Sequence, residues 1–389
     1  MTAVAHVRDR WKMGVEARAL VLLTSVLLAF GLAVLYSASA MVALGDDHGS
    51  AYYLIRQVIG LGAGVVAFAV AAKLDAERWK GWAWPLMIVT MAMLLVIVLP
   101  FTTAIAPRIN GSRRFLLGSS LQPSEIGKLA VIVWTAMLLV KKGDQMRRLT
   151  KGLLPFLIVV GVLDLLVVLE PDLSVAMMYT LVMGIVLFAG GVRIGHFVVL
   201  GIVAIPVLYH EIEKLQYVML RMVTFLDPGT SPAIGYQLRQ SLIAVGSGGA
   251  LGRGFGEGRQ QLGWVPFGYN DFIASNIGEE WGFVGLLFIT TAFALYAWLG
   301  LRIARSARSP FLQLVALGLT VTVVMTAFLH IGVVVGLLPT TGLTLPFISY
   351  GRSNLVLSLF MTGMLVNIGS TKERVHGATA TDPLAAPAW

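Results

Sequence analysis

Long apolar segments alternate with short polar ones along almost the whole chain. A helix that crosses the hydrocarbon core of a bilayer needs about 20 predominantly apolar residues. Lipid cannot hydrogen-bond to an open backbone, so repeated segments of this length favour a bundle of helices. We therefore predict an all-α, polytopic membrane protein with about ten transmembrane helices, at approximately residues 18–43, 54–73, 82–101, 123–141, 152–169, 172–190, 195–210, 274–301, 310–338 and 344–368.

The longest polar interruption, residues 211–273, is predicted to be a long external loop between the seventh and eighth spans. Seven glycines lie between Gly246 and Gly258, and glycine backbone can take positive φ and approach other groups closely. The segment lacks the G-x-x-x-x-G-K-[ST] pattern of a nucleotide-binding loop. Asp271 follows near its end, and a long loop carrying isolated carboxylates in an apolar scaffold is where function is expected.

Composition supports the membrane prediction and narrows the binding partners. Of the 389 residues, 57% are hydrophobic and 13% are charged, about half the charged fraction of a soluble domain. The absence of cysteine excludes disulfides and thiolate chemistry. The net charge of +9 comes from basic residues beside the predicted spans, which favours contacts with anionic lipid or phosphate and not with nucleic acid.

The first span has one alternative interpretation. Four basic residues precede or begin it, and Ala38-Ser39-Ala40 resembles a signal-peptidase site. The apolar run, however, exceeds the roughly 7–15 residues of a signal-peptide core. We interpret it as a retained helix.

Orientation follows from the distribution of Lys and Arg in the loops. With the N-terminus inside, 18 of these residues are cytoplasmic and 8 are external. The sequence thus predicts a cytoplasmic N-terminal segment (1–17), a membrane domain (18–370) and a disordered cytoplasmic tail (371–389). The loop 102–122 is external in this arrangement, although it carries Arg108, Arg113 and Arg114.

A set of motifs in fixed order resembles one known family. They are YYLIRQ (52–57), NGSRRFLLG (110–118) with LQPSEIGKLA (121–130), EPDLS (170–174), GYQLRQSLIAVGSGGALGRG (235–254), NDFIASNIGEEWGFVG (270–285) and GLTLPFISYGRSN (342–354). Together they resemble the SEDS family of shape, elongation, division and sporulation proteins, over nearly all of residues 18–370. The spacing in GFGEGRQQLGWVP and Thr344 in GLTLPFISYG are more similar to the division branch, FtsW, than to the elongation branch, RodA. Tyr269-Asn270 stands where the family commonly has His-Thr.

The resemblance implies an enzyme of the bacterial cytoplasmic (inner) membrane. Family members are ten-span, inverting peptidoglycan glycosyltransferases that polymerise glycan strands from lipid II at the outer face. Their partners are lipid II, a polyprenyl-pyrophosphate-linked glycan chain, a class B penicillin-binding protein transpeptidase and other divisome proteins. A lipid II flippase and a non-catalytic division scaffold are the alternatives. A flippase should carry charge through its spans, and Asp164 is the main such residue here.

Asp271 matches the family's essential aspartate, which implies a catalytic role. A sugar hydroxyl is a poor nucleophile, and a carboxylate within hydrogen-bond reach can accept its proton. The alternative from the residues alone is that Asn270 or Asp271 caps the helix that follows.

Other motif residues are candidates for substrate binding. Arg114 could hold pyrophosphate through its guanidinium fork, or contact a lipid headgroup. Glu125 and Lys128, at i,i+3, can pair on one helix face, and the family match favours a role in positioning substrate. Each of the remaining candidates could equally brace the scaffold: Arg56, Arg239, Gln240, Glu279 and Glu280. The six histidines are dispersed and indicate no metal cluster; a divalent cation assisting pyrophosphate departure is left open.

Overall fold

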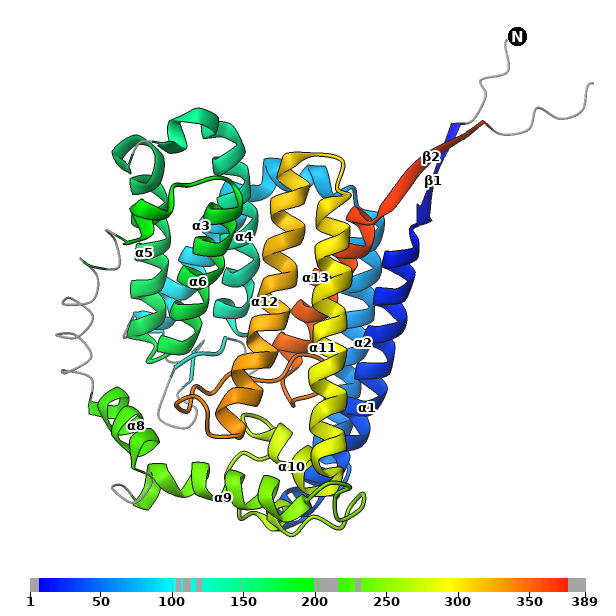
Figure 1. The fold of residues 1–389 in the computed structure, drawn as a ribbon, viewed down its shortest axis with the longest axis vertical. Helices are drawn as coiled ribbons and strands as arrows, with labels where there is room; N and C mark the ends of the chain where they lie inside the picture. The colour runs from blue at the N-terminus through cyan, green and yellow to red at the C-terminus, as the bar shows by residue number, and fades with distance from the viewer. Residues whose placement is uncertain are drawn as a thin grey trace, which may run out of the picture.

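The protein is a bundle of long helices with shorter helices across one end (Figure 1). The computed structural model describes residues 7–99, 101–102, 106–107, 113–116, 121–147, 149–198, 202, 216–227 and 232–376. Nine apolar helices run through the described part of the bundle: α1 (Val15–Gly45), α2 (Tyr52–Lys73), α3 (Trp79–Val98), α4 (Pro123–Lys142), α5 (Leu154–Leu169), α6 (Leu173–Ala189), α11 (Gly282–Arg305), α12 (Pro310–Val334) and α13 (Arg352–Ile368).

Seven of these helical segments are long and apolar enough to cross a membrane, whereas α6 and α13 are shorter. Short 3₁₀ and π turns precede α3 (Ala76–Arg78) and α5 (Gly143–Arg147 and Leu149–Leu153). The prediction of a helical membrane protein is confirmed. Most of the predicted span 195–210 lies outside the described residues.

The predicted loop 211–273 is partly helical, which corrects the sequence prediction. It contains α8 (Gln216–Leu226), α9 (Pro232–Gly248) and a 3₁₀ turn at Gln260–Leu262. Helices α8 and α9 lie across one end of the bundle, next to α10 (Ile273–Glu280), so we call this the α10 end (Figure 1). Both helices are too short and too polar to register as membrane spans, so the sequence pattern showed only an interruption.

The predicted eighth span is two helices. α10 ends at Glu280, and α11 begins at Gly282 after a break at Trp281. Gly282 has φ of 63°, and a Cβ on it would lie 2.3 Å from the backbone nitrogen of Gly252. Only glycine fits such a position, so Gly282 permits the break that the apolar pattern concealed.

The last predicted span also begins later than expected. Residues 335–351 are non-helical, and α13 starts at Arg352 and not at residue 344. Pro339 and Pro346 lack the N–H that a helix requires, and Gly342 has φ of 79°. Irregular backbone is tolerated at membrane depth where protein covers it, and most of residues 343–349 are buried. We call residues 340–351 the re-entrant segment.

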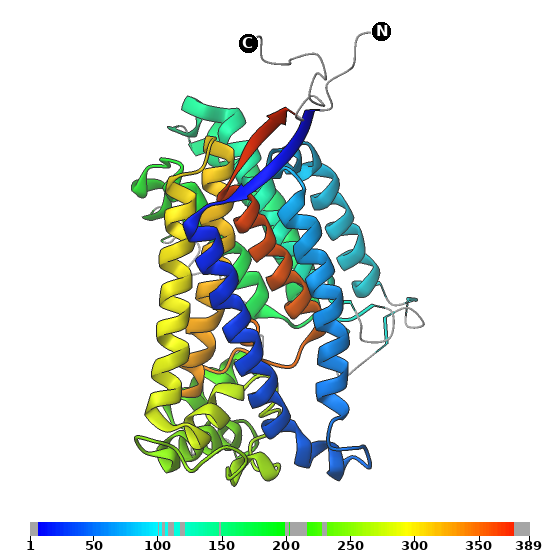
Figure 2. The same cartoon turned by 90° about the vertical axis from the view of Figure 1, so that its right-hand side faces the viewer.

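The two ends of the described chain meet at the end of the bundle opposite α10 (Figure 2). Strand β1 (Val7–Met13) pairs antiparallel with β2 (Ser370–His376), from Val7 opposite His376 to Met13 opposite Ser370. Disorder was predicted from residue 371, so residues 371–376 correct that prediction; residues 377–389 lie outside the described chain.

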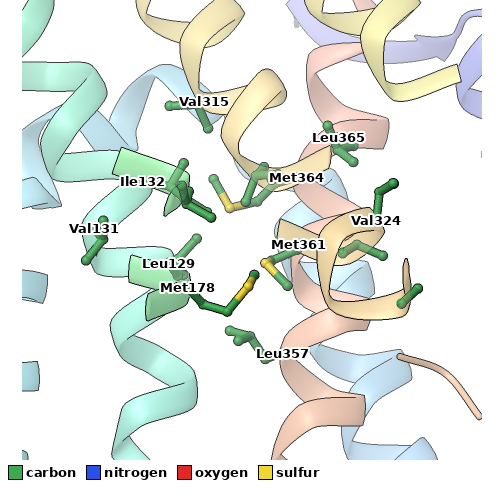
Figure 3. Packing of buried hydrophobic residues seen from close by; sticks show 14 of the residues in the cluster. Leu129, Val131, Ile132, Met178, Val315, Val324, Leu357, Met361, Met364 and Leu365 are labelled. Carbon is green, nitrogen blue, oxygen red and sulfur yellow. The ribbon is translucent and has the colours of Figure 1, made fainter. Parts of the chain in front are cut away.

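The core lies between α4, α6, α12 and α13, where aliphatic and methionine side chains interlock (Figure 3). Helix α4 is the most buried of the long helices. Close approach of α2 and α13 depends on Gly363, because a Cβ there would lie 2.5 Å from the carbonyl oxygen of Phe68. The outward faces of α1, α2, α5 and α11 expose large apolar side chains, including Leu22, Val66, Leu165 and Phe283, as expected for lipid contact.

Candidate active site

Asp271 lies in a tight turn immediately before α10. The backbone nitrogens of Asn270 and Asp271 both donate to the carbonyl oxygen of Phe267, at 2.9 and 3.1 Å. The N-cap of α10 is Phe272, and no side chain caps the helix there. The alternative that Asn270 or Asp271 caps α10 is therefore wrong, and the carboxylate of Asp271 is available for other chemistry.

The re-entrant segment forms the wall beside this carboxylate. A Cβ on Gly342 would lie 3.8 Å from Oδ2 of Asp271, so the glycine brings bare backbone close to the acid. Two further bonds join this segment to the Asp271 turn. Ser349 Oγ donates to the carbonyl oxygen of Asn270 at 2.7 Å, and the backbone nitrogen of Tyr350 donates to the carbonyl oxygen of Tyr269 at 3.1 Å.

The re-entrant segment is in turn held by three other helices. Ser174 of α6 donates to the carbonyl oxygen of Thr341 at 2.6 Å, and Arg221 of α8 donates to that of Thr340 at 3.2 Å. The third helix is α2, whose buried Gln57 donates to Ser349 O at 3.0 Å and accepts from the nitrogen of Gly351 at 3.2 Å. Helices far apart in the sequence thus fix the position of the re-entrant segment.

Arg114 reaches the same region from the segment 113–116. Its Nε donates to the carbonyl oxygen of Glu170 at 3.2 Å, its Nη2 to that of Pro171 at 2.5 Å, and its Nη1 lies 3.5 Å from Oδ2 of Asp172. The neighbouring Arg113 instead donates to the carbonyl oxygens of Ala106 and Leu99. Arg114 therefore belongs to the site, and Arg113 braces its own segment.

The electrostatics of the site make Asp271 a weak acid. Burial raises the pKa of the half-buried Asp271 carboxyl to about 7; Arg114 and Arg221 lower that pKa and Asp172 raises it. A carboxyl with a pKa near neutrality is well matched to accept a proton in catalysis.

Glu170, at the end of α5, is also a weak acid. Burial, with a smaller contribution from Asp172, raises the pKa of Glu170 to about 9, against the opposing effect of Arg114. The carboxylate that pairs with Arg114 is Asp172, whose Oδ2 lies 3.5 Å from Nη1.

Glu125 and Lys128 form a buried ion pair, with Nζ 2.7 Å from Oε1. Glu125 faces a cavity of about 450 Å³ between α2, α3, α4 and α13. Its polar end is formed by Gln122, Glu125, Arg352 and Ser353, and apolar side chains line most of the rest. Arg352 and Ser353 directly follow the re-entrant segment, so two residues that line the cavity are adjacent in the chain to the segment beside Asp271.

The remaining predicted substrate-binding residues lie elsewhere or serve the scaffold. Glu279 is buried and accepts from the backbone nitrogens of Arg259 and Gln260, each at 3.0 Å. Glu280 accepts from Ser37 Oγ at 2.5 Å. These contacts favour the bracing interpretation, because they anchor the glycine-rich segment and α1.

No contact described above connects Asp271 with Arg56, or with Arg239 and Gln240 of α9. Arg56 is exposed, with its guanidinium 4.7 Å from the ring centroid of Tyr52. Arg239 is exposed and Gln240 half-buried on α9. Substrate binding by these three residues stays a prediction.

Sequence reasoning missed Arg221, which it counted only as an external charge within a loop. The signal that could have found it is the amphipathic segment around it, since α8 is a helix of 11 residues. It also missed buried His330 of α12, which gave no motif signal. Among the described residues, no group of three or more His, Asp or Glu side chains is arranged to hold a metal ion.

Comparison with known proteins decides the family. The family model FTSW_RODA_SPOVE, described as cell cycle protein, matches residues 18–374. The chain belongs to this family. A "Probable peptidoglycan glycosyltransferase FtsW" of Trichlorobacter lovleyi is 39% identical over 354 residues, covering 90% of this chain and 92% of the relative. The stage V sporulation protein E of Bacillus subtilis is 35% identical over 352 residues, covering 90% and 95%.

Solved structures of the FtsW/RodA/SpoVE type share the fold. A chain from a structure titled "Structural coordination of polymerization and crosslinking by a peptidoglycan synthase complex" superposes with a TM-score of 0.75, at 26% identity, over 90% of this chain and 97% of that one. A variant of the rod shape determining protein RodA of Thermus thermophilus gives a TM-score of 0.66, at 25% identity, over 90% and 96%.

Proposed function

We propose that this FtsW-like protein is a peptidoglycan glycosyltransferase that polymerises glycan strands from lipid II during cell division. The observation that carries the proposal is the placement of Asp271 in the turn before α10, beside the re-entrant segment, where no side-chain cap of the helix occupies it. Burial raises the pKa of this carboxyl to about 7, although Arg114 and Arg221 lower it. Family membership and the glycosyltransferase relatives support the same activity.

In the proposed reaction, the 4-hydroxyl of a lipid II sugar attacks the anomeric carbon of the growing chain, which is linked to polyprenyl pyrophosphate. Asp271 accepts the hydroxyl proton as the new carbon–oxygen bond forms. The bond between the anomeric carbon and the phosphate oxygen breaks with inversion, and polyprenyl pyrophosphate leaves. Arg114 and Arg221 stabilise the charge that develops on the leaving group. Assistance by a divalent cation in the departure of the pyrophosphate stays a prediction.

The cavity beside Glu125 supports a lipid-linked substrate. Its apolar length between α2, α3, α4 and α13 suits a polyprenyl tail, and its polar end suits the pyrophosphate to which the tail is attached. Arg352 adds a positive charge at that end.

The arrangement of the bundle supports an orientation in the bacterial inner membrane. Both ends of the described chain lie at one end of the bundle, opposite α10 (Figure 2). With the positive-inside pattern of the sequence, we place both termini in the cytoplasm and Asp271 at the outer face, where a class B penicillin-binding protein would cross-link the product. Other divisome proteins complete the proposed assembly.

A flippase is less well supported, because Asp164 is the main charged residue in the middle of a span, and Glu170, Asp172 and Asp271 lie beyond the helix ends. The two activities separate in one experiment with the purified protein in vesicles, supplied with labelled lipid II and a class B transpeptidase. We expect glycan chains from the wild type and not from Asp271→Ala. Translocation of lipid II without any chain formation would overturn the proposal.

A further inference from the structure

His330 is a buried histidine of α12 that bonds to two separate backbone segments. Its Nδ1 lies 2.7 Å from the carbonyl oxygen of Leu343 in the re-entrant segment. Its Nε2 accepts from the backbone nitrogen of Ala274, in the first turn of α10, at 3.4 Å. One imidazole therefore joins α12, α10 and the re-entrant segment.

The two bonds require one form of the ring. A carbonyl oxygen can only accept and a backbone N–H can only donate, so Nδ1 must carry the proton and Nε2 must offer its lone pair. The nitrogens in the first turn of a helix have no partner within the helix. Because Phe272 at the N-cap of α10 offers no side-chain acceptor, the imidazole satisfies a donor that a capping side chain would normally satisfy.

Both bonds lie next to Asp271. Ala274 is three residues after the aspartate, and Leu343 directly follows Gly342, whose backbone passes Oδ2 of Asp271. Ser349 and Tyr350 already tie the re-entrant segment to the residues before Asp271. His330 ties it to the residues after Asp271, so the turn is held on both sides.

We propose that His330 is a positioning residue, which fixes Asp271 against the re-entrant segment through its neutral, Nδ1-protonated imidazole. The inference rests on the proposed function, in which Asp271 is the base. A small displacement of a reacting group, about 1 Å, can cost on the order of 10²-fold in rate. Loosening either bond should therefore lower turnover more than it weakens substrate binding.

Three variants separate the two bonds. His330→Asn keeps an N–H near the place of Nδ1 and loses the acceptor for Ala274. His330→Gln places a carbonyl oxygen near Nε2 and loses the donor to Leu343. His330→Leu loses both. Thr326→Val is the matched control, because Thr326 is also buried on α12 but bonds only to Thr322 O of its own helix.

The measurements are kcat and KM for glycan polymerisation across about pH 5 to 9, together with the midpoint of thermal unfolding. We expect kcat to fall roughly 10- to 100-fold in His330→Leu, less in the other two variants, with KM changed less than about threefold. The acidic limb of the pH profile should move to lower pH, because a loosened Asp271 gains water while Arg114, Asp172 and Arg221 still face it. Thr326→Val should lose stability alone.

The results distinguish this inference from the proposed function. Near-normal turnover in Asp271→Asn would contradict the proposed function, in which Asp271 is the base. If Asp271→Asn is inactive but the His330 variants keep the wild-type kcat and pH profile, only the positioning role of His330 is overturned. If the variants do not fold, ¹⁵N-histidine spectra of the wild type decide, since a ring protonated at Nε2 near pH 7 contradicts the inference.

Discussion

Nη1 of Arg114 lies 3.5 Å from Oδ2 of Asp172, and the same guanidinium also donates to the carbonyl oxygens of Glu170 and Pro171. Its planar fork is thus oriented by the turn between α5 and α6. The side chain remains partly exposed (31%), which leaves part of the guanidinium for a substrate anion. An arginine held in this way is preorganised to bind an anion, as its proposed role toward pyrophosphate requires.

Arg114→Lys should lower polymerisation by roughly 10- to 100-fold, because a lysine keeps the charge but cannot reproduce the fork. Arg113→Lys is the matched control and should lose stability more than activity, since Arg113 bonds to the backbone of its own segment. Initial rates on labelled lipid II and thermal unfolding measure both effects. Equal, near-normal rates in both variants would instead indicate contacts with lipid headgroups.

Asp271→Asn should reduce turnover by roughly 10²–10⁴-fold, the usual contribution of a positioned base, without unfolding the protein. In the wild type, kcat/KM should rise with pH up to about 7, because the carboxyl must lose its proton to act. A wild-type profile that is flat between about pH 5.5 and 8 would contradict a base with this pKa.

The same substitution should stabilise the protein at high pH. The folded-state pKa of Asp271, about 7, lies above the ordinary 3.8, so the folded state binds more protons between these values. Stability contributed by this group is therefore lost as pH rises through that window. We expect Asp271→Asn to unfold at a higher temperature than the wild type at about pH 8 and at a similar temperature near pH 4. The reverse order would contradict the raised pKa.

Gly342→Ala should impair both folding and activity. Its φ of 79° disfavours a side chain, at a cost of about 1–2 kcal/mol, and relief of that strain would shift the backbone beside Asp271. Gly62 of α2 is the control, because a Cβ there meets no atom within 4 Å, and Ala should stabilise that helix by up to about 1 kcal/mol. Denaturation midpoints and polymerisation rates of both variants check the contrast.

Ala63→Phe should obstruct the cavity beside Glu125. Ala63 lines it on α2, so a larger side chain there should raise KM for lipid II by about tenfold while kcat changes little. Val66→Phe, on the exposed face of the same helix, is the control and should leave KM unchanged. An equal KM in both variants would place the polyprenyl tail elsewhere.

The sequence predicted the helical class and most spans, because apolar length is a strong signal. It failed where a local rule overrode that signal. Gly282 breaks the eighth span, and Pro339, Gly342 and Pro346 keep the re-entrant segment out of α13. The glycines and prolines that cause both breaks are present in the sequence, but the apolar runs around them are long enough to indicate continuous spans.

The sequence predicted those residues of the candidate site that lie within family motifs. Asp271 and Arg114 follow from the family resemblance, whereas Arg221 and His330 reach the re-entrant segment through contacts between residues far apart in the sequence. No spacing rule places α8 beside the re-entrant segment. The roles of Glu279 and Glu280 were equally open until the structure showed their oxygens bonded within the scaffold.

The re-entrant segment has a consequence for biogenesis. It lies between the last two apolar helices of the described chain, and α13, with 17 residues, is short for a span. The partners of Gln57, Ser349 and Gly351, and the backbone beside Asp271 all belong to this late segment of the chain. A chain that ends before Thr340 would therefore carry Asp271 but none of the re-entrant residues that bond to its turn. The site would thus be completed late in synthesis, about 70 residues after Asp271 itself has been made.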